Sequence, residues 1–285
     1  MPLPHFQKAH INSPFLAKTL PVTWQTQNMS PQTQPSHQRP SHQRPSQEQP
    51  SHPQPSHQLP ELIGRVRRVR TGPAVTQKWS GREISTGAAK APRADRVIAT
   101  ENGLDGDAQG NLKVHGGPNK AMCCYPLEFM AQWAADGFDL PEGAFFENLT
   151  LEDLPDQVVY LGDIFELNDL TVQVTQPRRP CATVSARWSD RRLPRLMQSK
   201  SRSGYYLRVL HPGTIAEGDT MRLVKRLPNA VSVAETNRVM NIDRQDIEGI
   251  HRLLAAPELP ERWRATLQRR LEGQLEEDTA RLGNP

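Results

Sequence analysis

The residue with the clearest capacity for chemistry in this sequence is Cys181, which ends the segment TQPRRPC at residues 175–181. Two prolines stiffen this loop, and it directly follows an expected strand, so we expect the cysteine at a strand end. The adjacent Arg178 and Arg179 would lower the thiol pKa from about 8.5 and favour the thiolate, which attacks electrophiles and binds soft metals. From the residues alone, the alternative is a cysteine that packs as a small hydrophobic side chain.

A second candidate is the segment KVHGGPNK at residues 113–120. Paired glycines can adopt positive φ angles and bring backbone N–H groups up to a ligand, while lysine and histidine add positive charge. The segment therefore predicts a loop that holds a phosphate, and the alternative is an ordinary Gly-Pro turn with solvated lysines. The candidate contacts are Lys113, His115, Gly116, Gly117 and Lys120.

Two further polar segments invite a ligand interpretation. The segment GLDGDAQG at residues 103–110 superficially resembles a calcium loop, but the position twelve along from Asp105 is Gly116, which has no carboxylate. We therefore expect Asp105 and Asp107 to pin a loop or to pair with a basic residue. Asn148 lies in an apolar stretch and is expected to be a satisfied buried amide or, alternatively, a ligand contact.

The cysteine count and the absent motifs restrict the cofactor classes. The three cysteines, Cys123, Cys124 and Cys181, cannot staple a secreted fold or supply a four-thiolate iron–sulfur site. The sequence has no CxxC pair, HExxH, Walker loop or GxGxxG motif, which leaves zinc ribbons, zincins, nucleotide kinases and Rossmann cofactors without support. Cys123 precedes an expected helix and is most simply a core residue.

Charge is distributed unevenly along the 285 residues, whose net charge is +4. Residues 1–60 hold four Lys or Arg and one Glu, and the remainder holds 31 Lys or Arg against 30 Asp or Glu. Because residues 61–285 are nearly neutral, we do not expect them to bind nucleic acid strongly. Four arginines in the C-terminal region nevertheless keep a helix-turn-helix DNA reader as an alternative: Arg262, Arg264, Arg269 and Arg270.

The first 60 residues differ in composition from the rest. They hold 12 of the 26 prolines and 6 of the 9 histidines, and SHQRP-like pentapeptides repeat from Ser36 to Pro60. Such a segment has almost nothing apolar to bury, so we expect residues 1–60 to form a disordered tail. No run approaches the roughly 18 apolar residues of a membrane helix, so we expect a cytoplasmic protein without a membrane partner.

Residues 61–227 are expected to form mostly strands with a few helices, arranged as a barrel-like domain. Turn residues Asn168 and Asp169 predict a hairpin. A helix is expected from Pro126 to Asp136, with Gly137 as its stop. The expected strands are Leu62–Val69, Gln157–Leu167, Thr171–Val174 and Met221–Val224.

Residues 228–285 are expected to form a small bundle of three helices. Ser232 and Glu235 have capping-box spacing at the start of the first helix. Asp243 is expected to cap the second helix. Apolar residues four apart mark the third helix, namely Trp263, Leu267 and Leu271.

The order of the motifs resembles that of a MOSC domain, the domain named after the molybdenum-cofactor sulfurase C-terminus. Between Gly103 and Asp219 the chain carries GLDGD, KVHGGPNKA, CCYP, FFENLT, VYLGDIFEL, VTQPRRPC and HPGTIAEGD in that order. The chain is most similar to bacterial stand-alone proteins linked to 6-N-hydroxylaminopurine resistance. In these proteins a MOSC β-barrel is followed by a small three-helix domain, so the resemblance implies a mostly β (α+β) fold of that type.

The resemblance implies molybdenum-cofactor chemistry, with Cys181 on the family's cysteine. In the family's reductases this thiolate ligates molybdenum beside the pterin dithiolene, and in the sulfurase relatives it is proposed to carry sulfur. Cys181 would thus be the catalytic residue and metal ligand, and pyridoxal phosphate binding is a further property associated with the family. The residues implied to bind molybdopterin are Lys113, His115, Gly116, Gly117, Lys120, Asn148 and Arg178. Cys124 departs from the family, since relatives often have histidine there.

The function implied is a molybdenum-dependent reductase of N-hydroxylated compounds such as 6-N-hydroxylaminopurine. An external electron-donor protein would be needed, because the chain has no flavin, nicotinamide or iron–sulfur signature. The alternative is a carrier of the molybdenum cofactor or of a persulfide sulfur, without turnover. No nucleic-acid partner is expected, and a partly exposed barrel edge would allow a homodimer.

Overall fold

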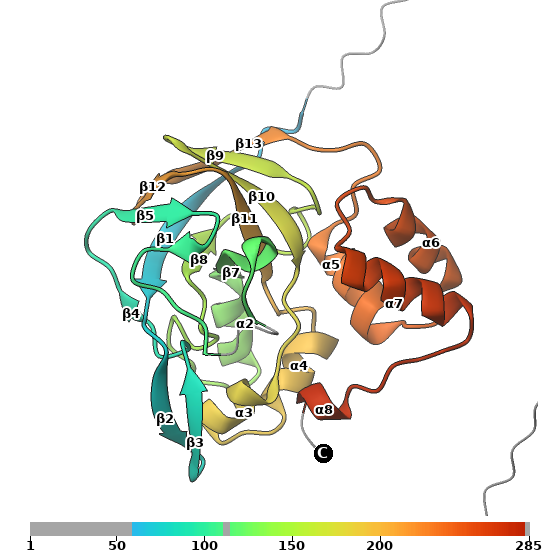
Figure 1. The fold of residues 1–285 in the computed structure, drawn as a ribbon, viewed down its shortest axis with the longest axis horizontal. Helices are drawn as coiled ribbons and strands as arrows, with labels where there is room; N and C mark the ends of the chain where they lie inside the picture. The colour runs from blue at the N-terminus through green and yellow to red at the C-terminus, as the bar shows by residue number, and fades with distance from the viewer. Residues whose placement is uncertain (1–58, 111–114, 283–285) are drawn as a thin grey trace, which may run out of the picture. The chain divides into compact units, whose positions relative to one another are not determined.

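The computed structural model describes residues 59–110 and 115–282, and its central feature is a closed barrel of seven strands (Figure 1). The strands follow the order β13-β9-β10-β11-β7-β8-β1, and β1 closes the barrel by pairing with β13. All these pairs are antiparallel except β7 with β8. The barrel strands are β1 (Ile63–Thr71), β7 (Met122–Pro126), β8 (Leu149–Glu152), β9 (Ile164–Leu167), β10 (Leu170–Pro177), β11 (Tyr205–His211) and β13 (Thr220–Lys225).

The remaining strands are short and are not part of the closed barrel. Strand β4 (Ala91–Pro92) extends the edge at β1, and a three-stranded sheet joins β5 (Val97–Thr100), β6 (Gly103–Leu104) and β12 (Gly213–Ile215). Strands β2 (Val75–Trp79) and β3 (Arg82–Thr86) form a separate hairpin that the sequence analysis did not predict. Its less exposed positions, Gln77, Trp79, Ile84 and Thr86, alternate with exposed ones, but two of these four are polar, so the sequence shows too little apolar alternation to indicate strands.

The hairpin predicted at Asn168 is confirmed, because β9 pairs with β10 around this turn and Asn168 has a φ of 54°. The expected strand from Gln157 is too long. Residues 157–163 form turns and one isolated bridge at Tyr160, and regular strand begins at Ile164.

Three helices, α2 (Glu128–Ala135), α3 (Ala182–Trp188) and α4 (Leu193–Ser199), pack around a second apolar cluster. The prediction that Pro126 starts α2 is wrong, since Pro126 is the last residue of β7 and lies opposite Leu151. The stop at Gly137 is confirmed, because its φ is +83° and its N–H donates to Ala134 O. Helices α3 and α4 were not predicted. The buried members of the cluster are Tyr125, Phe129, Trp133, Ala144, Phe145, Val184, Leu193 and Met197.

The C-terminal region is helical, as expected, and consists of α5 (Val233–Asn237) with its π-helical continuation η2 (Arg238–Ile242), α6 (Ile247–Ala255), α7 (Glu261–Leu271) and the short α8 (Thr279–Leu282). Ser232 caps α5, because its Oγ accepts the Glu235 N–H at 3.1 Å. The expected cap at Asp243 is wrong: the Asp246 carboxylate accepts the Gly249 N–H at 2.9 Å instead.

One position of the third helix also differs from its prediction. Trp263 and Leu267 are buried, but Leu271 is 38% exposed and the buried neighbour is Arg270. Its guanidinium donates to the carbonyl oxygens of Val239 and Met240, at 3.0 and 2.7 Å, and pairs with Glu276. These hydrogen bonds satisfy the carbonyl groups at the end of η2, which explains why a charged residue is buried here.

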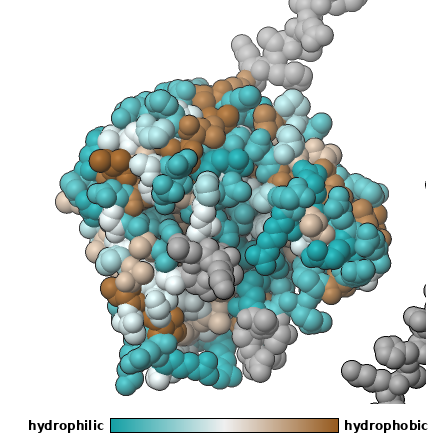
Figure 2. Space-filling model, viewed as in Figure 1, coloured by the Kyte–Doolittle hydropathy of each residue, from teal (hydrophilic) through white to brown (hydrophobic). Residues whose placement is uncertain are grey.

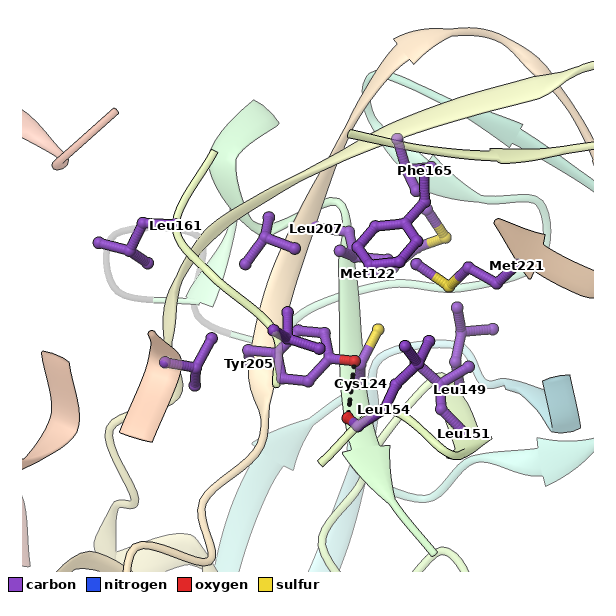
Figure 3. Packing of buried hydrophobic residues seen from close by; sticks show 14 of the residues in the cluster. Met122, Cys124, Leu149, Leu151, Leu154, Leu161, Phe165, Tyr205, Leu207 and Met221 are labelled. Carbon is purple, nitrogen blue, oxygen red and sulfur yellow. Dashed lines mark hydrogen bonds between the residues drawn. The ribbon is translucent and has the colours of Figure 1, made fainter. Parts of the chain in front are cut away.

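The barrel interior and the C-terminal helices share one hydrophobic core. Figure 3 shows its barrel part, where the Tyr205 hydroxyl donates to Leu154 O at 3.2 Å beside Cys124. Cys124 is fully buried there, so it packs as a core residue. The same cluster continues into the helices through Val233, Val239, Ile250, Leu253, Trp263 and Leu267. We infer that the barrel and the helices stabilise each other.

The surface drawn in Figure 2 is mostly hydrophilic, with hydrophobic side chains in small scattered groups. Within residues 59–110 and 115–282, no helix combines the length and the apolar character needed to cross a bilayer. The tail expected over residues 1–60 lies outside the described residues except for its last two.

Replacing Arg270 tests the internal role of this arginine. We expect Arg270→Met to lower the free energy of unfolding by about 3 kcal/mol, because two buried carbonyl groups lose their donor and Glu276 loses one of its arginine partners. Urea denaturation measures the loss. Arg269→Met is the matched control, since Arg269 is exposed on the same helix, and an equal loss in both variants would contradict the assignment.

Candidate functional site

Five of the eight predicted site residues line a single cavity of about 240 Å³: His115, Lys120, Asn148, Arg178 and Cys181. Lys113 lies outside the described residues. Gly116 and Gly117 are not among the residues that line the cavity. Gly117 instead has a φ of +95° and leads into the 3-10 turn η1 (Pro118–Lys120), whose Lys120 N–H donates to Gly117 O at 2.9 Å. The glycine therefore turns the chain so that Lys120 reaches the cavity.

Cys181 lies just beyond the end of β10, between that strand and α3. Strand β10 ends at Pro177, and the loop is tied back to the barrel by the Arg178 N–H, which donates to Gly204 O at 2.8 Å. Cys181 has extended backbone angles and is the residue before the first turn of α3, and its carbonyl accepts the Val184 N–H at 3.1 Å. The predicted placement at a strand end is therefore confirmed.

The thiol of Cys181 is acidic. Burial raises the pKa of Cys181, but hydrogen bonds with His115 and Thr183, together with the charges of His115 and Arg178, outweigh burial and lower the pKa to about 6. At neutral pH most of this cysteine is therefore thiolate. The direction of the shift is as predicted, but its main source is His115 rather than the adjacent arginine pair.

Arg178 and Arg179, which precede Cys181 in the loop, have different hydrogen-bond partners. Arg178 is buried in the cavity wall, donates to Phe145 O, and places its guanidinium carbon 5.9 Å from the centre of the Phe146 ring. Arg179 also borders the cavity, but its guanidinium donates to Asn241 and Asp278 in the C-terminal region. Arg178 thus acts on the thiol, while Arg179 joins the loop to the helices.

Positive charge dominates the cavity. Lys120, whose ammonium lies 5.6 Å from the centre of the Tyr206 ring, has a lowered pKa because it is buried and lies near Arg262 and Arg179. The other cationic side chains in the wall are Lys90, Arg178 and Arg179. Such a set favours an anionic ligand over a cationic one.

Asn148 is held by protein groups on both sides of its amide. Its Oδ1 accepts the Cys123 N–H at 3.0 Å, and its Nδ2 donates to Arg70 O at 3.2 Å. This agrees with the expectation of a satisfied buried amide, and the residue joins β7 to β1 beside the cavity, which Asn148 itself lines. Cys123 also lines the cavity, and burial raises the pKa of its thiol.

Two segments of the cavity wall, residues 84–88 and 107–110, were not predicted from the sequence. They cross so closely that a Cβ on Gly87 would lie 1.6 Å from Ala108 O, which explains a glycine there. Asp107 holds the crossing in place, because its Oδ1 accepts the Gly72 N–H at 3.0 Å and its carboxylate pairs with Lys90. The pairing expected for Asp107 with a basic residue is thus confirmed.

Two aromatic side chains of the wall, Phe146 and Tyr206, were also missed. Phe146 stacks on Trp79 of the β2–β3 hairpin with ring centres 5.8 Å apart. The aromatic pair in FFENLT was the available signal for Phe146, whereas Tyr206 lies within an ordinary strand pattern.

The acidity of Cys181 can be measured without any ligand. We expect alkylation by iodoacetamide to reach half its maximal rate near pH 6, because the thiolate is the reacting form. His115→Gln should move this midpoint up toward about 8.5, since the principal stabilising contact is lost. Cys181→Ser serves as the blank, and a wild-type midpoint above pH 8 would contradict the assigned contacts.

Comparison with known proteins agrees with this architecture. A MOSC domain is matched over residues 111–222, and a YiiM-like 3-alpha helix domain is matched over residues 231–274. YflK of Bacillus subtilis (strain 168) is 34% identical over 206 residues, which are 72% of this chain and 93% of YflK. A protein named "Reductase" from Gibberella moniliformis is 31% identical over 183 residues, which are 62% of this chain but 32% of that protein.

YiiM of Escherichia coli is similar in sequence and in structure. The YiiM protein of strain K12 is 37% identical over 193 residues, which cover 65% of this chain and 85% of YiiM. The crystal structure of YiiM from Escherichia coli superposes with a TM-score of 0.63 and 29% identity, over 77% of this chain and 99% of that chain. This chain therefore belongs to the YiiM family of proteins, in which a MOSC domain is followed by a three-α-helix domain.

Proposed function

We propose that this chain is a molybdenum-cofactor-dependent reductase of N-hydroxylated compounds, with 6-N-hydroxylaminopurine bases or nucleosides as representative substrates. The observation that carries the proposal is the Cys181 thiolate in a cavity lined by cationic side chains. A thiolate is a ligand for soft metals, and the cations favour an anionic partner beside it. The similarity to the Gibberella protein named "Reductase" supports reduction as the reaction class.

The donor set of the cavity fits a metal that brings ligands of its own. Among the residues that the structure describes, no three His, Cys, Asp or Glu side chains come together as a metal site. A metal bound to Cys181 would therefore need most of its ligands from a non-protein molecule. Molybdopterin supplies two dithiolene sulfurs and an anionic phosphate, and Lys120 and Arg178 would hold that phosphate.

The overall reaction converts R–NHOH, two electrons and two protons into R–NH2 and water, and an external electron-donor protein supplies the electrons. When bound, the molybdenum centre supplies oxygen-atom transfer coupled to a two-electron change. His115 and Thr183 keep the Cys181 sulfur deprotonated and ready to act as a ligand. Phe146 and Tyr206 contribute aromatic surface to the cavity wall, beside which a planar purine would lie.

A carrier function is the second candidate, and the same thiolate favours it. Cys181 is partly accessible, and its low pKa suits a persulfide sulfur as well as a metal ligand. The two functions differ in turnover, because a carrier delivers at most one equivalent for each cysteine.

Metal content tests the assigned ligand. In protein purified from cells that make the cofactor, we expect near-stoichiometric molybdenum and pterin in the wild type and the loss of both in Cys181→Ser. Elemental analysis and pterin fluorescence measure them. Cys124→Ser is the control, because Cys124 is buried in the core and is not among the residues that line the cavity. Wild-type protein without metal and pterin would refute the reductase and leave the sulfur carrier.

Turnover separates the reductase from the carrier. With a chemically reduced donor dye and 6-N-hydroxylaminopurine, the reductase should form many equivalents of the amine, and Cys181→Ser should form none. Product is measured by chromatography. One equivalent or less from the wild type would favour the carrier, and unchanged activity in Cys181→Ser would exclude both functions.

A further inference from the structure

The last described segment of the chain, residues 276–282, runs from the helical region to the loop that carries Cys181. We call this segment the C-terminal strap. In Figure 1 the chain leaves α7, continues as an extended stretch and ends in α8 beside α4. The strap begins at Glu276, whose carboxylate accepts from Arg270 Nε at 3.0 Å and lies 3.3 Å from Arg244 Nη2. Its first residue is thus anchored to the interior of the helical region.

The other end of the strap contacts the cysteine loop through two arginines. Arg179, in the loop, donates from Nη2 to Asp278 Oδ1 at 3.0 Å. Arg281, in the strap, donates from Nη1 to Pro180 O at 2.7 Å and from Nη2 to Gln198 Oε1 of α4 at 2.6 Å. Asp278 also lies 3.0 Å from Arg281 Nη2, so one carboxylate holds both arginines.

We propose that the C-terminal strap is a positioning element for Cys181, in which Arg281 grips the carbonyl of Pro180 and fixes the peptide that precedes the cysteine. The sulfur is thereby held against His115 and Thr183. Arg281 is a positioning residue here, because it acts on the thiol through the backbone of the loop. This positioning role rests on the proposed function, because a side chain that binds a metal must keep one position.

The composition of the loop explains why its backbone needs a hydrogen bond from another segment of the chain. Pro180 has no N–H to donate, so its carbonyl is the backbone group that remains available for anchoring. A guanidinium presents several donors in a rigid plane, which lets Arg281 bridge the loop and α4 at once. The side chains of Arg281 and Asp278 are 19% and 18% exposed, so solvent screens their interaction only in part.

The strap lies beyond both domain matches, which end at residues 222 and 274. Its contacts with the loop therefore add to what the barrel and the three-helix domain provide by themselves. They also give Arg179 a role, because its guanidinium donates to Asp278 of the strap.

The test uses the full chain and reads out the thiol directly. In Arg281→Met we expect the pH midpoint of Cys181 alkylation by iodoacetamide to rise by about one unit, which is about tenfold less thiolate at low pH. Asp278→Asn should raise the midpoint in the same direction, because it releases both arginines. Arg252→Met is the matched control, since Arg252 forms surface ion pairs with Glu235 and Asp246 in the same helical region and should leave the midpoint unchanged.

Arg281→Lys distinguishes position from charge. Lysine keeps the charge but not the planar fork, so a midpoint that stays raised supports the proposal, and full recovery of the wild-type midpoint would overturn it. An unchanged midpoint in both Arg281→Met and Asp278→Asn would also overturn it. The alkylation is carried out on protein from cells that do not make the cofactor, so that no metal covers the Cys181 sulfur. The results then test the strap separately from molybdenum binding, and a wild type that proves metal-free in cofactor-producing cells would refute the reductase but not the strap.

Discussion

The site depends on keeping a partly buried sulfur ionised. Burial disfavours a thiolate, and the opposing contacts must come from groups that the fold brings together. Thr183 belongs to the helix that begins beside Cys181, whereas His115 comes from a segment far earlier in the chain. The strand order that closes the barrel places these segments side by side, so the acidity of one cysteine depends on the arrangement of the barrel.

Several arginines of this protein form hydrogen bonds and ion pairs that join one segment of the chain to another. Arg264 donates to the carbonyl oxygens of Leu254 and Ala256, at 2.6 and 3.0 Å, and so caps the end of α6. Arg226 pairs with the buried Asp163 at 2.6 Å and packs on the Tyr160 ring, just before the chain enters the helical region. A guanidinium suits such sites because it can satisfy several carbonyl or carboxylate oxygens at once. Two of the arginines that suggested a DNA reader, Arg264 and Arg270, are thus engaged within the domain.

The helical region is part of the architecture of the site as well as of the core. Its apolar residues continue the barrel core, and Asn241 accepts a hydrogen bond from Arg179 at the cavity border. Gln198 of α4 donates to Asn241 O at 3.0 Å, so the helices beside Cys181 and those of the C-terminal region are bonded to each other. The barrel and the helical domain are therefore joined in this chain by a shared core and by side-chain hydrogen bonds.

The sequence by itself determined the features that depend on local chemistry. The β9–β10 hairpin, the Ser232 cap, the Gly137 stop and the position of Cys181 at a strand end follow from turn, capping and alternation patterns over a few residues. The same patterns failed where a neighbour in space decides. The less exposed face of the β2–β3 hairpin mixes apolar and polar residues, so its pattern did not indicate strands. Arg270 replaces Leu271 in the interior because two carbonyl groups of η2 need donors.

In the site, the residue types were readable but their partners were not. Cys181, His115, Lys120 and Arg178 were identified from composition and resemblance, and the fold places them around one cavity. Only the tertiary structure assigns His115 to the thiol and turns Arg179 toward Asp278, although Arg178 and Arg179 are adjacent in sequence. The physical reason is that hydrogen bonds and charge interactions act over a few ångströms, and closure of the barrel decides which distant residues come within that range.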